Sequence, residues 1–247
     1  MGSSTLQTLK PLIVLCAVVA VAQMQRPSSH PSSGTTRAEV EHVSFAGEDG
    51  GLIYADLYGK GDRGVVLAHG GRFRKESWQP QALSLSRAGY RILAFDFRGF
   101  GKSQGPGDSD MFTAPVYLDV LAAIRYLRKN GAKTVAVMGG SFGGGAAADA
   151  SIASRPGEIS CLILLAGEGN GSAERIKAPL LEIVAQDDAS EDGPRLPRIR
   201  AWFDNAPQPK ELIVLKGSAH AQFLFHTDQA DRVMKEVLRF LNKYDQS

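Results

Sequence analysis

Apolar and polar positions follow two alternating patterns along residues 40–244. Several short runs are apolar almost throughout, as expected for strands that are covered on both faces of a parallel sheet. Amphipathic stretches separate them; in 116–129, Leu118, Leu121 and Leu127 fall on one helical stripe. The expected strands are 65–68, 91–97, 134–138, 161–165, 180–184 and 211–215, and the expected helices are 81–88, 116–129, 142–154, 197–205 and 228–243.

This order of elements predicts an α/β domain with a doubly wound, mostly parallel sheet. Two alternating runs, 40–45 and 52–57, surround Gly50-Gly51 and predict an N-terminal antiparallel hairpin. The connection 166–179 is too short to hold a large cap domain. Sheets of this class bind ligands at the carboxyl ends of their strands, so that is where chemistry is expected.

The N-terminal segment has the pattern of an export signal. Lys10 precedes an apolar run, 11–22, that is shorter than the ~20 residues of a spanning helix. The run ends in Ala20-Val21-Ala22, which fits the small-x-small pattern of signal cleavage. We therefore expect a signal peptide at 1–22, a flexible polar linker at 23–38 and the folded domain at 39–247. The protein is then periplasmic or secreted, with no stable membrane span after cleavage; an uncleaved anchor and a buried N-terminal helix are the alternatives.

Charge and cysteine content narrow the functional classes. A formal net charge of +2, without a run of five like charges, gives no indication of nucleic-acid binding. Cys161 lies in an apolar run and is interpreted as a small core residue. Cys and His residues show no metal-ligand spacing, so neither a metal nor another cofactor is expected.

The most specific chemical signal lies in residues 134–144, where an expected strand runs into Gly139-Gly140-Ser141-Phe142-Gly143 and then a helix. A serine on such a sharp strand-to-helix turn is exposed for nucleophilic attack. The following helix N-terminus directs N–H groups toward a developing oxyanion. A phosphate-binding G-x-G-x-x-G loop is disfavoured, because Ser141 stands where that pattern requires glycine.

Together with His69-Gly70-Gly71 and the segment 96–103, this turn resembles the α/β-hydrolase superfamily over residues 40–244. The resemblance is closest to small bacterial serine esterases and dienelactone-hydrolase-like proteins. It implies a Ser–acid–His triad in that chain order. A dienelactone hydrolase would carry Cys in place of Ser141, so the serine favours ester hydrolysis.

The resemblance also points to the acid and the base. The family's spacing after the strand 180–184 favours Asp188 over Asp187 as the acid. His220 follows the last strand in a loop of small residues and is the expected base, with His226 as a weak alternative. His69 is interpreted as a residue that orients its loop.

The oxyanion hole and substrate contacts are expected in the loop after the first parallel strand. The backbone N–H of Phe142 and that of Gly71 are the expected oxyanion donors, with Arg72 as the second choice for the latter. Arg72, Phe73 and Trp78 are the candidate substrate-binding residues, although a solvated loop charge and ordinary packing aromatics have the same sequence pattern.

The sequence thus predicts a serine carboxylesterase-like hydrolase that cleaves small or flexible esters through an acyl-enzyme. A peptidase or amidase of the same fold and a non-catalytic binding module are the alternatives. The expected partner is a small-molecule ester, and the oligomeric state is not specified by the sequence.

Overall fold

The computed structural model describes residues 1–2 and 40–246. Apart from Met1 and Gly2, the expected signal peptide (1–22) and linker (23–38) lie outside the described residues. Within the described part of the chain, no helix has both the length and the apolar character needed to cross a bilayer.

Eight strands form a single sheet in the order β1-β2-β4-β3-β5-β6-β7-β10. β1 pairs antiparallel with β2, and β2 with β4, while the remaining neighbours are parallel. The expected hairpin and the mostly parallel sheet are therefore confirmed. The strands are β1 Val40–Ala46, β2 Leu52–Tyr58, β3 Arg63–Ala68, β4 Arg91–Phe95, β5 Thr134–Gly140, β6 Leu162–Leu165, β7 Leu180–Ala185 and β10 Lys210–Leu215, and β8 Ala189–Ser190 pairs separately with β9 Gly193–Pro194.

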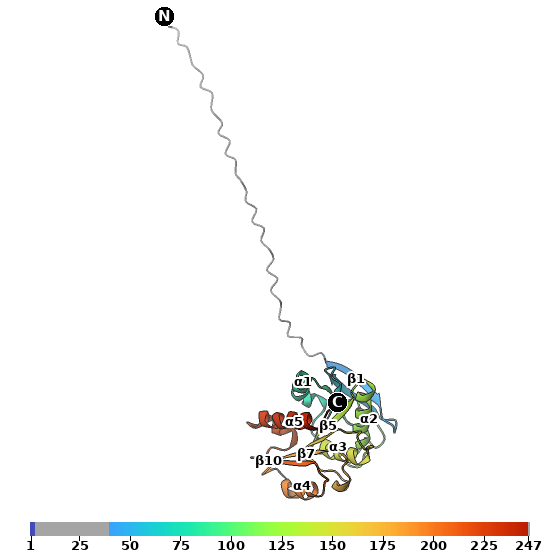
Figure 1. The fold of residues 1–247 in the computed structure, drawn as a ribbon. Coiled ribbons are helices and arrows are strands. Elements are labelled where there is room, and N and C mark those ends of the chain that lie inside the picture. The colour runs from blue at the N-terminus through green and yellow to red at the C-terminus, as the bar shows by residue number, and fades with distance from the viewer. Residues whose placement is uncertain (3–39, 247) are drawn as a thin grey trace. The chain divides into compact units, whose positions relative to one another are not determined.

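Helices cover both faces of the sheet (Figure 1). Successive strand side chains point to opposite faces, so Val66 packs in one apolar cluster with α2 and α3, while Val65 packs in a second with α1 and α5. The helices are α1 Gln79–Arg87, α2 Tyr117–Lys129, α3 Phe142–Ala153, α4 Arg195–Asp204 and α5 Ala230–Tyr244, and the short 3₁₀ helices are η1 Lys75–Trp78, η2 Ala173–Arg175 and η3 Ala221–His226.

The connectivity of the sheet indicates at which edge a ligand-binding site is expected. The chain passes from β3 to β4 on one side and then crosses to β5 on the other, which creates a topological switch point between β3 and β5. The loops that follow β3, β5, β7 and β10 all leave from the same edge, because these strands are parallel. Only η2 interrupts the connection from β6 to β7, as expected for a fold without a large cap.

A buried ion pair anchors the segment after β4. Arg98 is 1% exposed, and its Nη2 donates to Oδ1 of the fully buried Asp119 at 2.6 Å. Arg98 also pairs with Asp49 in the turn between β1 and β2. This part of the sequence motif at 96–103 is therefore structural, and it ties the hairpin to α2.

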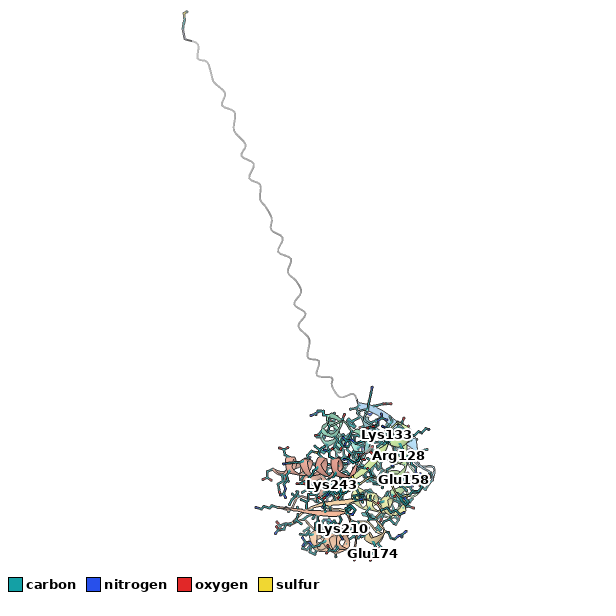
Figure 2. All side chains as sticks on the ribbon, viewed as in Figure 1. Arg128, Lys133, Glu158, Glu174, Lys210 and Lys243 are labelled. Atoms are coloured by element: carbon teal, nitrogen blue, oxygen red, sulfur yellow. The ribbon has the colours of Figure 1, made fainter. Side chains whose placement is uncertain are left out.

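Many charged side chains lie on the outside of the domain (Figure 2). Lys133 and Lys243, for example, have side chains that are 70% and 53% exposed and pair with nearby carboxylates. Exposed pairs of this kind contribute little to stability, so the two apolar clusters carry most of the folding free energy.

Candidate active site

Ser141 occupies a strained turn between β5 and α3, with φ of +51°. Gly139 and Gly143 allow that turn because they have no side chains that would clash with the neighbouring backbone. A Cβ at Gly139 would lie 2.3 Å from the carbonyl oxygen of Gly143, and a Cβ at Gly143 would lie 2.3 Å from that of Ala68. The backbone therefore crosses itself too closely for any side chain, and this holds Ser141 in a conformation that costs ~1–3 kcal/mol.

Three side chains distant in sequence meet beyond this turn. His220 Nε2 lies 2.7 Å from Ser141 Oγ, and His220 Nδ1 lies 2.7 Å from Asp188 Oδ2. The Asp188 side chain is 1% exposed, whereas that of His220 is 26% exposed. The arrangement has the connectivity of a nucleophile, a base and an orienting acid.

The structure distinguishes the two aspartates and the two histidines that the sequence offered. Asp187 points to solvent, while its backbone N–H donates to the carbonyl of Gly217. His226 ends η3 and lies against Phe223, with ring centroids 6.1 Å apart. Only Asp188 and His220 join the hydrogen-bonded line to Ser141.

The carboxylate of Asp188 has a second neighbour, Arg195, at the start of α4. The Arg195 Nε atom lies 3.4 Å from Asp188 Oδ1, and the Arg195 backbone N–H donates to the Asp188 carbonyl at 2.8 Å. The backbone bond ties the loop that carries Asp188 to the first turn of α4.

Gly71 and Phe142 lie close together beside Ser141. A Cβ at Gly71 would lie 3.7 Å from the Cβ of Phe142 and 2.8 Å from Cε of Met111. Among the described residues, neither the Gly71 N–H nor the Phe142 N–H has a hydrogen-bond acceptor. Two backbone donors without an acceptor in the described part of the chain thus lie near the nucleophile, where the sequence predicts the oxyanion hole.

Gln222 of η3 connects the loop after β3 with η1, and the sequence did not predict this role. The Gly70 N–H donates to Gln222 Oε1 at 2.7 Å, and Gln222 Nε2 donates to Ser77 Oγ at 2.8 Å. Gln222 is 5% exposed, although its residue type favours the surface. The only available signal was its position, two residues after His220.

His69 is buried behind the Gly70–Gly71 loop. Its Nδ1–H donates to the Gly70 carbonyl at 2.9 Å, and its Nε2 accepts the N–H of Phe97 at 3.3 Å. Burial lowers the pKa of His69 to about 4, so the ring is neutral at physiological pH. These contacts orient the loop, in agreement with the interpretation from sequence.

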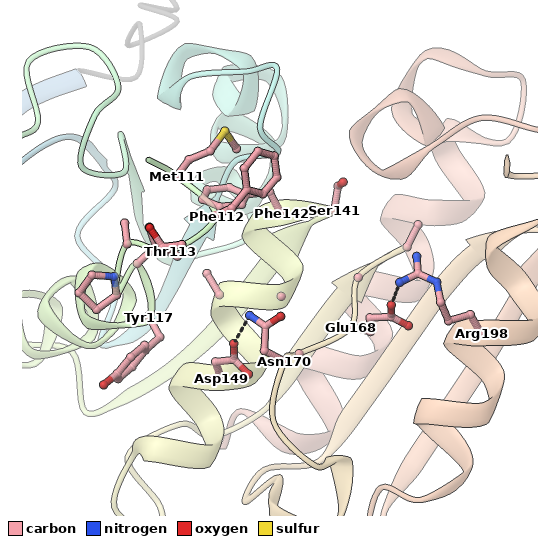
Figure 3. Close-up of a pocket in the computed structure, with 18 of the residues that line it drawn as sticks. Met111, Phe112, Thr113, Tyr117, Ser141, Phe142, Asp149, Glu168, Asn170 and Arg198 are labelled. Atoms are coloured by element: carbon pink, nitrogen blue, oxygen red, sulfur yellow. Dashed lines mark hydrogen bonds and ion pairs between the residues drawn. The ribbon is translucent and has the colours of Figure 1, made fainter. Parts of the chain in front are cut away.

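A cavity of about 620 Å³ opens beside Ser141 (Figure 3). One wall is the face of α3 that carries Phe142 and Asp149. The segments 111–117 and 166–170, together with Arg195 and Arg198 of α4, complete it.

The candidate substrate-binding residues from the sequence do not line this cavity. Trp78 is fully buried and packs edge-on against Phe225, because η1 turns it into the core; it is a packing residue. Arg72 is exposed to solvent. Phe73 is half-buried against Phe223, with ring centroids 5.1 Å apart, on the side of the site that carries η3.

Comparison with known proteins agrees with this geometry. A family model described as the alpha/beta hydrolase fold matches residues 65–244, most of the described domain. The chain belongs to the α/β-hydrolase family. An esterase of Pyrococcus furiosus has a similar structure, with a TM-score of 0.73, 19% identity and coverage of 85% of this chain and 94% of that one. A dienelactone hydrolase of Anabaena variabilis has a TM-score of 0.70 at 19% identity, covering 85% of this chain and 99% of that one.

Similarity at the level of sequence is more local. A non-heme haloperoxidase of Rhodococcus erythropolis is 35% identical over 100 residues, which is 39% of this α/β-hydrolase and 34% of that protein. The matched segments span 15% to 40% of the length of the curated relatives. The family is therefore established, and the activity has to be argued from the site.

Proposed function

We propose that this α/β-hydrolase is a serine hydrolase that cleaves carboxylic esters of small or flexible substrates through an acyl-enzyme. The observation that carries the proposal is the hydrogen-bonded line from Ser141 Oγ through His220 to the buried Asp188, with 2.7 Å at each step. The unpaired N–H groups of Gly71 and Phe142 support it, because an ester carbonyl oxygen develops negative charge during attack.

In the first half of the reaction, Ser141 Oγ attacks the ester carbonyl carbon while His220 Nε2 takes the hydroxyl proton. The carbonyl electrons move to the oxygen, which accepts hydrogen bonds from the Gly71 and Phe142 N–H groups. When the carbonyl re-forms, the bond to the alcohol oxygen breaks, and this oxygen takes the proton from His220. Asp188 holds Nδ1–H and stabilises the imidazolium.

In the second half, water takes the place of the alcohol. His220 removes one proton from water, and the remaining hydroxide bonds to the acyl carbon. Ser141 leaves and regains the proton from Nε2, which releases a carboxylic acid and restores the free enzyme. The net reaction is ester plus water to acid plus alcohol, and each proton is accounted for by His220.

Turnover of p-nitrophenyl butyrate by purified protein tests the proposal. We expect Ser141→Ala to lower kcat by about 10⁴-fold or more, because the nucleophile is lost. Ser218→Ala, an exposed serine in the loop before His220, is the matched control and should retain full activity. Unchanged hydrolysis by Ser141→Ala would overturn the proposal.

Two further measurements separate the alternatives within the fold. A comparison of p-nitrophenyl butyrate with the matching anilide distinguishes an esterase from an amidase, since the amine leaving group is harder to expel. A fluorophosphonate probe should label wild-type protein at Ser141, whereas a non-catalytic binding module would remain unlabelled.

The similarity to the Rhodococcus haloperoxidase favours a second candidate function, halide oxidation with hydrogen peroxide. Bromination of phenol red in the presence of peroxide and bromide would reveal it. Bromination by wild-type protein without ester hydrolysis would favour this function over the esterase.

A further inference from the structure

The geometry at Ser141 determines where each part of an ester has to lie, given the proposed function. The carbonyl carbon in the tetrahedral intermediate has four substituents. Ser141 Oγ is one, and the oxyanion beside Gly71 and Phe142 is the second. The alcohol oxygen is the third, and it has to face His220 Nε2, from which it takes its proton. The acyl chain therefore takes the direction that remains.

The 620 Å³ cavity lies in that remaining direction. Ser141 and Phe142 line it, whereas neither His220 nor any residue of η3 does. The alcohol would then leave on the side of η3, where Phe73 packs against Phe223, which is 41% exposed. The cavity is thus the acyl subsite, and the leaving alcohol is left on a more open surface.

One face of α3 forms the length of the cavity. Phe142, Ala146 and Asp149 line it, and their spacing of four and three residues places them on one helical stripe. With a rise of ~1.5 Å per residue, Ser141 and Asp149 are about 12 Å apart along the helix axis. The subsite therefore extends well beyond a two-carbon acyl group.

The two ends of the subsite differ in polarity (Figure 3). Near Ser141 it is apolar, with the rings of Phe112 and Phe142 and the side chain of Met111. The far end is polar: Asn170 Nδ2 donates to Asp149 Oδ2 at 3.1 Å, and the second carboxylate oxygen of Asp149 accepts the Gly171 N–H at 3.0 Å.

A second polar pair, Glu168 with Arg198, stands at the α4 wall. The lining carries two carboxylates, Asp149 and Glu168, and two guanidiniums, Arg195 and Arg198. Each guanidinium already lies beside a carboxylate, Arg198 beside Glu168 and Arg195 beside Asp188. Both oxygens of Asp149 accept N–H groups, so no charge of the wall is left to favour an anionic or a cationic ligand. A neutral group that both donates and accepts hydrogen bonds fits this end best.

We propose that the cavity selects esters whose acyl chain ends in a neutral hydrogen-bonding group, such as an ω-hydroxyl. An acyl chain that ends in a methyl group would displace water from Asn170 and Arg198 without replacing the hydrogen bonds of that water. A terminal hydroxyl can accept a hydrogen bond from the N–H groups of either side chain and donate one to the amide oxygen of Asn170. The apolar stretch beside Ser141 accommodates the methylene part of the same chain.

The test compares p-nitrophenyl esters of plain and ω-hydroxy acids with four, six and eight carbons. We expect the ω-hydroxyl to raise kcat/KM about fivefold at one chain length, which is the effect of one net hydrogen bond to side chains that are open to solvent. The advantage should be smaller at the other two lengths, because the polar end lies at a fixed depth. An advantage that is equal at all three lengths, or absent, overturns the proposal.

Variants with matched controls test which side chains cause the selection. Asn170→Leu and Arg198→Met should each reduce the preference for the ω-hydroxy ester, measured within one variant as the ratio of its kcat/KM to that of the plain ester of equal length. Asn205→Leu and Arg200→Met change the same residue types at exposed positions outside the cavity and should leave the preference intact. Retention of the full preference in both cavity variants contradicts the assignment.

The outcome also separates this inference from the proposed function. If wild-type protein hydrolyses none of the six esters, the esterase proposal itself fails. If it hydrolyses them all and Ser141→Ala does not, but the ω-hydroxyl gives no advantage, only the acyl-subsite inference fails.

Discussion

Among single residues, Gln222 links the expected oxyanion loop to the segment that follows His220. It is buried, and its amide oxygen accepts the Gly70 N–H at 2.7 Å. That bond holds the His69–Gly70 peptide, which directly precedes the peptide with the Gly71 N–H, the expected oxyanion donor. Since His220 lies two residues before Gln222, the same side chain also sets the distance between the base and the oxyanion loop.

We expect Gln222→Leu to lower kcat by about 10²-fold, with KM within about threefold, because a displaced oxyanion donor matters only in the transition state. Gln222→Glu keeps an acceptor for the Gly70 N–H and should recover part of the loss. Steady-state kinetics check both values, and Gln186→Leu, at an exposed position, is the control. A fall in melting temperature with unchanged kcat would show that Gln222 is only structural.

At the scale of elements, the turn after β6 supports the Ser141 turn from below. The Leu165 carbonyl accepts the Ser141 N–H at 2.9 Å, and Ala166 next to it has φ of +49°. Glu182 of β7 lies under this turn, fully buried, with Oε1 accepting the Gly167 N–H at 3.4 Å. Burial raises the pKa of Glu182 well above its usual value, because the charged carboxylate would lose its solvation.

This burial makes the stability of the fold depend on pH. The unfolded chain releases the Glu182 proton near pH 4.5, the ordinary pKa of a glutamate side chain, while the folded chain retains it. The stabilisation is therefore complete below pH 4.5 and is lost as pH rises toward the folded pKa, by ~1.4 kcal/mol per pH unit. Glu182→Gln does not titrate, so its free energy of unfolding relative to wild type should increase from pH 4.5 upward.

Denaturant unfolding at several pH values measures this difference. Glu211→Gln is a control of opposite sign, because hydrogen bonds from Arg239 lower the pKa of Glu211. That variant should lose stability at neutral pH and regain wild-type stability in acid, as Glu211 becomes protonated. A Glu182→Gln difference that stays constant with pH would mean that the carboxyl group ionises as readily in the folded state as in the unfolded chain.

The elements themselves were largely predictable, and the exceptions have physical causes. β4 ends at Phe95 rather than at residue 97, because the Phe97 N–H donates to the His69 ring instead of a neighbouring strand. α4 begins at Arg195, two residues before the expected start, since Pro197 is tolerated in a first helical turn. Local periodicity contains no signal for either event.

For the whole molecule, the sequence could predict features that depend on neighbouring residues, but not contacts between residues that are far apart along the chain. The fold follows from alternating patterns, and the Ser141, Asp188 and His220 positions follow from motif and family spacing; their catalytic roles stay predictions. Contacts between remote side chains leave no such pattern. The Gln222 bond to Gly70 joins residues 152 positions apart, and the burial of Trp78 depends on which way η1 turns.

The boundary of the folded domain gives the last prediction. Both apolar clusters are built from residues between Val40 and Tyr244, and β1 begins at Val40, paired with Tyr58. A chain that starts at Glu39 therefore contains every strand and helix of the described domain. We expect it to keep the melting temperature within about 2 °C and the ester turnover of the longer protein, since both apolar clusters of the described domain are kept. A large fall in melting temperature on truncation would place part of the fold before residue 39.

The proposed signal peptide has a test of its own. The exported form should begin at Gln23 by N-terminal sequencing, whereas an exported chain that still begins at Met1 would favour the uncleaved anchor.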